Sequence, residues 1–403
     1  METQALMEGF PPPPELQVTL GNWRKPPFSK WSFKHVCEIV PSAEISNDPQ
    51  FVRNLPSALY DFEELAIKED GNSYGLESFL RATDTDGFVV MRGGRIIYEF
   101  YDNGMTPDTR HIFMSVSKSV LGLIAGILVE RGALDLNAVV TRWIPEIEKT
   151  AYAGATLRDL MDMRVGVLFD EDYLASAGAI IEYRKAQNWD PLAPGETPSD
   201  LRTFFRCLVD KDGAHGSRFH YVSPNTDLMG WVIERAAGVR YADLVSDLLW
   251  RPMGAARPAY ITVDRLGAPR CAGGFCATTR DLARLGLLLA EGGAYAGKQI
   301  VPSNWIADIL TKGDSNAWDA GDFLKYFPQM PIHYRSKWYV LQSAAPMMFG
   351  VGVFGQNVFI DRKNQIVIAK FSSQALPMDE KRILLTMHGI EAIRSRLLAP
   401  QTV

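Results

Sequence analysis

The chain has 403 residues, of which 47% are hydrophobic and 22% are charged, as in a globular protein that forms one large domain or two subdomains. Its net charge of -5 gives no support for nucleic acid or an anionic membrane surface as a partner. The four cysteines are scattered, without Cys-x-x-Cys or zinc-type spacing. We therefore expect no metal, no cofactor and mostly buried, reduced thiols.

The first 50 residues are rich in proline and aromatic side chains and show little periodicity, which predicts an extended arm on the body of the protein. Residues 1–16 contain acidic residues and a proline run at 11–14 but no apolar stretch. They therefore do not have the pattern of a secretory signal peptide. The longest uncharged apolar stretch, 119–129, is too short to span a bilayer. We expect a cytoplasmic protein without a membrane partner.

Two pairs of apolar runs, each interrupted by turn residues, predict β-hairpins near the two ends of the chain. The runs are 87–91 and 95–101 around Arg92-Gly93-Gly94, and 356–360 and 365–371 around 361–364. Residues 379–398 have the pattern of an amphipathic helix. Strands are thus expected at both ends of the chain.

The middle of the chain predicts helices. Threonine and aspartate stand ahead of apolar runs at 156–160 and 279–282, as they do at helix starts. A helix over 227–237 would end at Gly238, because glycine is favoured just beyond helix C-termini. Residues 241–250 predict another helix.

The order of these elements predicts an α+β fold in three parts. They are an extended arm at 1–50, a sheet-containing α/β subdomain from 51–112 and 270–403, and a mostly helical subdomain at 113–269.

A possible nucleophile lies at the start of the helical part. Ser115 and Lys118 are three residues apart, just before an apolar run, so they would share one face of a helix. Serine needs a neighbouring base to react, and a lysine with a lowered pKa can supply one. The helix N-terminus would favour a developing oxyanion. The same Ser-x-x-Lys sequence would also occur in a helix that starts with a capping serine and has a solvent-exposed lysine, without any catalytic role.

Two later segments could complete such a site. Tyr221-Val222-Ser223 is expected in a turn before a helix, and a tyrosine near an ammonium group can have a lowered pKa and act as a base. Residues 350–357 form a glycine-spaced strand. Glycines in a strand often mark a close backbone approach to a ligand, although they can also mark a bulge.

The order Ser-x-x-Lys, Tyr-x-Ser and glycine-containing strand resembles that of serine β-lactamases and penicillin-recognising enzymes. Within that fold the chain resembles the 6-aminohexanoate-dimer hydrolases and their esterase-like relatives. The similar stretches are 114–119 (MSVSKS), 171–173 (EDY), 223–227 (SPNTD), 261–264 (ITVD), 280–284 (RDLAR) and 355–357 (GQN).

The resemblance implies a β-lactamase/DD-peptidase-like architecture, with an antiparallel sheet flanked by N- and C-terminal helices and a mostly helical subdomain. It implies that Ser115 is the nucleophile, that Lys118 holds and polarises it, and that Tyr221 shuttles protons. The backbone N–H groups of Ser115 and Val353 would form the oxyanion hole.

The same resemblance suggests which residues contact substrate. Tyr173 is similar to a mobile-loop tyrosine that closes over the bound amide. Trp189 and Trp338 would be pocket walls, although a plain core role fits Trp338 equally well. The remaining residues expected to contact substrate are Arg184, Ala272, Ser223 and Phe354.

The chain departs from the family pattern at its third motif. Val353-Phe354-Gly355 carries no cation for a β-lactam carboxylate, which argues against β-lactam hydrolysis, as does Tyr-x-Ser in place of Tyr-x-Asn. Arg184 stands where a small residue or a carboxylate is expected, and Ala272 where Asn or His is expected. Arg184 would repel the ammonium end of a linear dimer.

We therefore predict a serine hydrolase that cleaves linear amide or carboxylic ester bonds of a small molecule through an acyl-enzyme, without nucleic acid and with a homodimer possible. The alternatives are a carboxylesterase with little amidase activity, a non-catalytic binding protein of the same fold, and a peptidoglycan peptidase. A Ser-His-Asp triad using His111, His215 or His220 has less support. A metal at 170–172 also has less support, because three adjacent acidic residues are more typical of an exposed loop.

Overall fold

A seven-stranded antiparallel sheet forms the centre of the computed structural model, which describes residues 6–399. The strand order is β11-β12-β13-β14-β15-β4-β5. The strands are β4 (Thr85–Arg92), β5 (Arg95–Tyr101), β11 (Ile332–Arg335), β12 (Trp338–Leu341), β13 (Met347–Gly352), β14 (Gln356–Asp361) and β15 (Ile366–Ser372). Both predicted hairpins are confirmed as β4–β5 and β14–β15, whereas β11 and β12 were not predicted.

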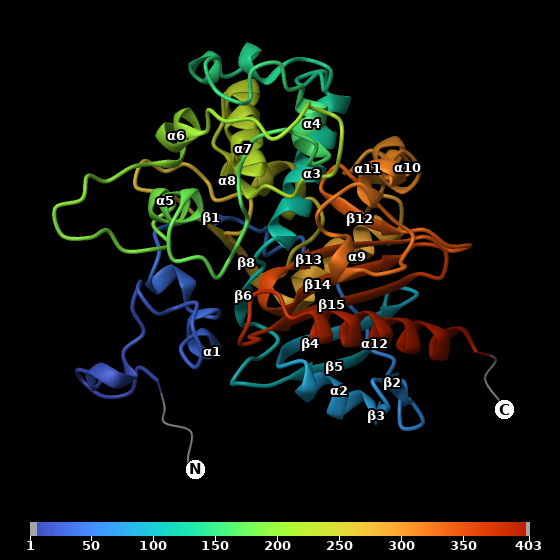
Figure 1. The fold of residues 1–403 in the computed structure, drawn as a ribbon. Coiled ribbons are helices and arrows are strands. Elements are labelled where there is room, and N and C mark those ends of the chain that lie inside the picture. Colours follow the sequence, from blue (N-terminus) through green and yellow to red (C-terminus); the bar gives the residue numbers. More distant parts are fainter. Residues whose placement is uncertain (1–5, 400–403) are drawn as a thin grey trace.

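Helices cover both faces of this sheet (Figure 1). Side chains alternate along β4, so that Val89 and Met91 join the core on one face, and Phe88 and Val90 join the core on the other. The first core contains α3 (Val116–Glu130) and α9 (Thr279–Ala290), and the second contains α2 (Leu76–Ala82) and α12 (Glu380–Leu398). The predicted C-terminal helix is confirmed, with Asp379 as its N-cap.

A further group of helices lies on the side of α3 away from the sheet (Figure 1). They are α4 (Leu157–Met161), α5 (Ala179–Ala186), α6 (Leu201–Phe204), α7 (Ser223–Ala237) and α8 (Tyr241–Val245), which continues as a π-helical turn to Trp250. Gly238 caps α7 in the left-handed conformation, as predicted. Two starts differ from the prediction: α7 begins at Ser223, and Thr278 rather than Thr279 caps α9.

A smaller sheet has the order β1-β7-β8-β6. Its strands are β1 (Ser42–Ile45), β7 (Ala259–Thr262), β8 (Phe275–Thr278) and β6 (Arg110–Ile112). The first 50 residues therefore contain β1 and the short helix α1 (Ser29–Ser32), neither of which was predicted for an extended arm. We retain the division into 51–112 with 270–403, and 113–269, as a proposal.

The other elements are peripheral. They are β2 (Ile67–Glu69), β3 (Asn72–Tyr74), β9 (Ala294–Tyr295), β10 (Lys298–Gln299), α10 (Ser303–Thr311) and α11 (Ser315–Asp319). Among the helices of residues 6–399, none has the length and apolar content that crossing a membrane requires.

Candidate active site

Ser115 and Lys118 lie together at the N-terminus of α3. The Lys118 Nζ atom is 2.7 Å from Ser115 Oγ and 2.8 Å from the carbonyl oxygen of Ala272. The Ser115 side chain makes no capping hydrogen bond, and Lys118 is only 1% exposed. The structure therefore excludes the alternative of a capping serine beside a solvated lysine. The predicted proximity of the Ser115 hydroxyl and the Lys118 amine is confirmed.

Burial changes the chemistry of this lysine. Burial lowers the pKa of Lys118 to about 7, and the nearby charges of Glu171 and Asp227 only partly oppose this. A substantial fraction of the amine is therefore neutral near pH 7. The neutral amine can donate to the Ala272 carbonyl and keep its lone pair for the Ser115 hydroxyl.

Tyr221 completes a cluster with these two residues. The Lys118 Nζ atom lies 4.9 Å from the centre of the Tyr221 ring, and this ring stacks on Phe323 with 4.4 Å between centroids. Burial raises the pKa of the Tyr221 phenol, although hydrogen bonding to Ser115 lowers it. The prediction that the pKa of this tyrosine is lowered is wrong, because loss of hydration is the larger effect. The phenol is therefore protonated at neutral pH.

The backbone of β13 approaches Ser115 closely where the strand ends. A Cβ atom on Gly352 would lie 3.0 Å from the Ser115 nitrogen and 2.6 Å from the Phe113 carbonyl oxygen, so only glycine fits here. The predicted single strand over 350–357 is in fact β13, a tight turn at Val353–Gly355, and the start of β14. Within residues 6–399, the N–H groups of Ser115 and Val353 have no backbone acceptor.

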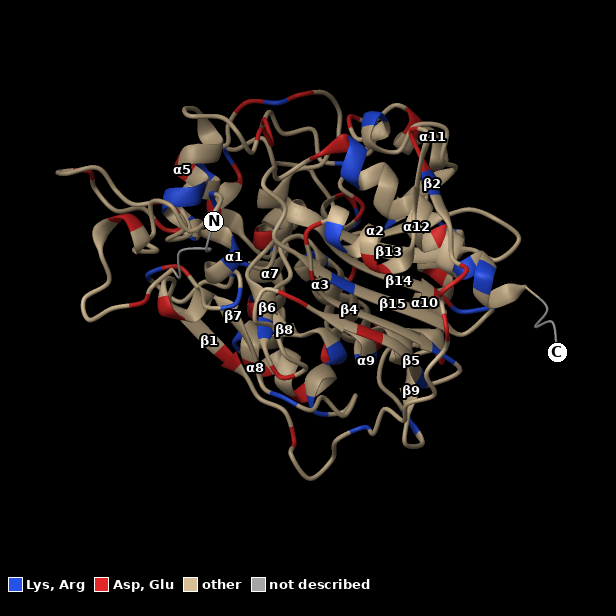
Figure 2. Cartoon of the chain, turned by 90° about the horizontal axis from the view of Figure 1, so that it is seen from below, with Lys and Arg blue, Asp and Glu red and all other residues tan. Residues whose placement is uncertain are grey.

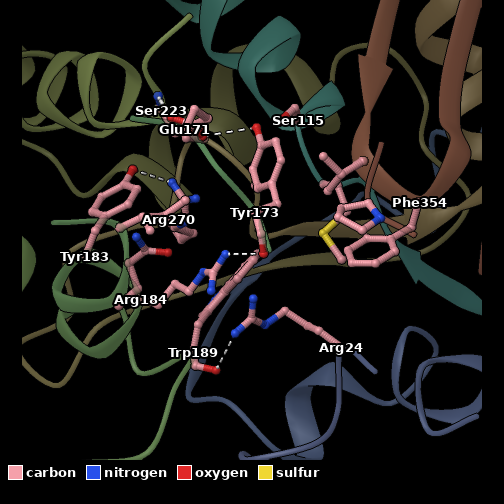
Figure 3. A pocket seen from close by; sticks show the side chains of 17 residues that line it. Arg24, Ser115, Glu171, Tyr173, Tyr183, Arg184, Trp189, Ser223, Arg270 and Phe354 are labelled. Atoms are coloured by element: carbon pink, nitrogen blue, oxygen red, sulfur yellow. Dashed lines mark hydrogen bonds between the residues drawn. The ribbon is translucent and has the colours of Figure 1, made fainter. Parts of the chain in front are cut away.

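A cavity of about 50 Å³ opens over Ser115 (Figure 3). The predicted residues that line it are Val353, Tyr173, Arg184, Trp189, Ser223, Ala272 and Phe354. Trp338 does not line it, because its side chain is fully buried in the core on β12. Tyr221 lines a neighbouring cavity of about 300 Å³ instead.

Glu171 connects the Tyr173 loop to the start of α7. It accepts hydrogen bonds from the Tyr173 hydroxyl at 3.1 Å, the Ser223 backbone N–H at 2.8 Å and the Ser223 hydroxyl. Sequence reasoning treated 170–172 as an exposed acidic loop. Asp170 and Asp172 are exposed, but Glu171 turns inward, and only its place in the EDY stretch could have indicated this.

A buried ion pair holds the other side of the site. Arg270 is 2.5 Å from the Asp227 carboxylate and 2.6 Å from the Tyr183 hydroxyl. Asp227 also accepts the Ala272 N–H at 2.7 Å, and the carbonyl of Ala272 contacts Lys118. Asp227 thus helps to position the catalytic lysine candidate. No local pattern could have identified this pair, because the two residues are distant in sequence.

The alternative histidine triad is not formed. The ring nitrogens of His111, His215 and His220 make their hydrogen bonds to groups other than Ser115. Among residues 6–399, the titratable side chains that hydrogen-bond to Ser115 are therefore Lys118 and Tyr221.

Comparisons with known proteins agree with this arrangement. The Beta-lactamase family model matches residues 78–387. The 6-aminohexanoate-dimer hydrolase of Paenarthrobacter ureafaciens is 33% identical over 357 residues, which cover 89% of this chain and 88% of that protein. Esterase EstB of Burkholderia gladioli is 28% identical over 188 residues, 44% of this chain and 47% of the esterase.

A similar solved structure comes from Bacillus anthracis, where the protein is provisionally named a 6-aminohexanoate-dimer hydrolase. It has a TM-score of 0.86 and 28% identity, and the match covers 97% of this chain and 100% of that one. The expected α+β, β-lactamase-like fold and the expected resemblance are both confirmed. The chain belongs to the β-lactamase family of serine hydrolases.

Proposed function

We propose that this chain cleaves linear amide or carboxylic ester bonds through an acyl-enzyme formed on Ser115. One observation carries this proposal: the Ser115 hydroxyl lies 2.7 Å from a buried amine whose pKa is lowered to about 7. A serine beside a partly neutral amine has the base that it needs to act as a nucleophile. The inner cavity gives a substrate carbonyl access to it.

In the proposed mechanism, neutral Lys118 accepts the proton of Ser115 while Oγ attacks the substrate carbonyl. The resulting oxyanion accepts hydrogen bonds from the N–H groups of Ser115 and Val353, each worth about 2.7–4 kcal/mol in comparable sites. The protonated Tyr221 phenol donates its proton to the departing amine or alkoxide and regains one from the Lys118 ammonium. Water then repeats the cycle on the acyl-enzyme. Tyr221 is thus an acid first, not the initial base that we expected.

Two candidate substrate classes follow from the relatives: linear 6-aminohexanoate amides and simple carboxylic esters. Arg184 in the cavity wall favours the second, because it opposes the ammonium end of a linear dimer. We expect p-nitrophenyl acetate to be hydrolysed faster than the dimer, by at least about tenfold in kcat/KM, since a tenfold rate difference needs only about 1.4 kcal/mol in the barrier. Parallel steady-state assays measure this, and faster cleavage of the dimer would contradict it.

Tyr221→Phe is expected to separate the two leaving groups. The variant keeps the ring that stacks on Phe323 but loses the proton donor, so amide cleavage should fall about 10²- to 10⁴-fold. p-Nitrophenolate departs without protonation, so the chromogenic ester should lose much less. Turnover of the two substrates by the same preparation gives the ratio. Equal losses on both would show that the phenol does not protonate the leaving group.

The remaining expectations are still predictions. A cytoplasmic location can be checked by fractionation, and a homodimer by light scattering on a size-exclusion column.

A further inference from the structure

Two cavities meet beside the nucleophile. The inner cavity of about 50 Å³ contains Ser115, and an outer cavity of about 650 Å³ lies next to it. Both are lined by Arg24, Tyr173, Arg184, Phe354 and Pro377. A substrate whose carbonyl is on Ser115 and whose chain enters the outer cavity must therefore pass Arg184.

The walls of these cavities carry an excess of positive charge, and Figure 2 shows Lys and Arg colouring on α5, the helix of Arg184. Most of these cations have a carboxylate partner. Arg24 pairs with Asp190, Arg270 with Asp227 at 2.5 Å, and Lys185 with Glu196 at 2.6 Å. Lys25 is exposed to solvent. Arg184 differs from all of them.

Arg184 is a buried guanidinium without a counterion. Its residue is 9% exposed, and one guanidinium nitrogen donates to the Tyr173 carbonyl at 2.6 Å. Within residues 6–399, no carboxylate lies within 4.0 Å of it. Burying a charge without a partner is energetically costly. A guanidinium has five N–H donors, and the single carbonyl contact leaves most of them free to bind a ligand.

The neighbouring arginine increases this imbalance. Burial, and also the charge of Arg184, lowers the pKa of Arg24 to about 10, although its partner Asp190 opposes this change. Two guanidinium groups therefore lie near each other at this junction, and within residues 6–399 only Arg24 of the two has a carboxylate partner. In Figure 3 both reach toward the middle of the lining, from the side of Tyr173 opposite Ser115.

We propose that Arg184 binds a carboxylate carried by the substrate at a distance from the scissile carbonyl, so that the enzyme prefers substrates with an anionic end. This inference rests on the proposed hydrolase function. A carboxylate fits better than a phosphate dianion, because it matches one unpaired guanidinium and can accept two parallel hydrogen bonds. A linear amide of an amino acid would then lie with its carboxylate end, not its ammonium end, toward Arg184.

The test compares substrates that differ only in one terminal group. The acyl series is p-nitrophenyl hexanoate, mono-p-nitrophenyl adipate and p-nitrophenyl 6-aminohexanoate, whose ends are neutral, anionic and cationic. The leaving-group series is the hexanoyl esters of hexanol and of 6-hydroxyhexanoate. We expect the anionic member of at least one series to exceed its neutral partner roughly tenfold to a hundredfold in kcat/KM, mainly through KM.

Variants of Arg184 test whether this side chain causes the preference for anionic substrates. Arg184→Gln should reduce the anionic-to-neutral ratio to about one, and Arg184→Glu should favour the cationic ester. Lys298→Gln removes the same charge from an exposed position on β10 and should leave the ratio unchanged. The measured quantity is the ratio of kcat/KM for the anionic and the neutral substrate. A variant that loses activity on all substrates equally therefore leaves this ratio unchanged.

The possible failures are distinct. If wild-type protein does not hydrolyse the neutral esters, the proposed hydrolase function fails. If it hydrolyses them but shows no anionic preference in either series, or if Arg184→Gln keeps the preference, the carboxylate site is refuted while the hydrolase stands.

Discussion

Ser115→Ala is expected to abolish turnover of p-nitrophenyl esters, lowering kcat by at least about a thousandfold. The hydroxyl is the only group of this side chain that can form the acyl bond, and it lies 2.7 Å from the amine of Lys118, the proposed base. Removing it leaves the proposed oxyanion hole and the cavity in place, so some residual catalysis should persist. Initial rates with p-nitrophenyl acetate give the size of the effect.

A matched control lies one turn further along the same helix. The Ser119 hydroxyl donates to the Lys337 carbonyl at 3.0 Å, so Ser119→Ala should cost about 1 kcal/mol of stability and keep most of the ester activity. A fluorophosphonate should label wild-type protein and the Ser119 variant, but not the Ser115 variant. Undiminished activity of Ser115→Ala, or no adduct on folded wild-type protein, would favour the non-catalytic binding protein.

The parts of the site that follow from residue spacing alone, without the family resemblance, are those set by local geometry. Ser115 and Lys118 are three residues apart at a helix start, so their proximity follows from the helical repeat. The hairpins β4–β5 and β14–β15 follow in the same way, from apolar runs around short turns. The glycines of 350–357 were expected to mark a close backbone approach to a ligand, whereas the close approach seen at Gly352 is to the backbone of Phe113 and Ser115, where the strand ends.

What could not be predicted depends on contacts between distant segments. The Arg270–Asp227 pair and the inward turn of Glu171 exist only once α7, the loop between α4 and α5, and the segment leading into β8 are packed together. The pKa of Tyr221 was predicted to be lowered but is raised, and this error also arises from contacts between distant segments. The sequence shows a nearby lysine, but the extent of burial, which is the larger effect, is a property of the folded core. Trp338 likewise could be assigned to core or pocket only after folding.

Lys118 should control the pH dependence of the reaction. Burial lowers its pKa to about 7, and only the neutral amine can accept the Ser115 proton, so kcat/KM should rise through an apparent pKa near 7 and fall on acidification. Lys118→Met should lose about 10²- to 10⁴-fold in kcat, the usual contribution of a general base. Lys118→Arg should be similarly inactive, because a guanidinium stays charged. Ester hydrolysis measured across this pH range tests all three proteins.

The pH at which kcat/KM falls on acidification, the acidic limb of the pH profile, identifies the group that titrates. The carboxylate of Glu171 raises the pKa of Lys118 against the larger effect of burial, so Glu171→Gln should remove that influence and move the limb to lower pH. Its kcat should also fall, because Glu171 holds Ser223 and Tyr173, but the limb position is independent of that loss. An active Lys118→Arg variant, or a limb that moves to higher pH in Glu171→Gln, would mean that another group takes the serine proton. The proposed mechanism requires a buried, partly neutral amine as the base for Ser115, so either result would remove its basis.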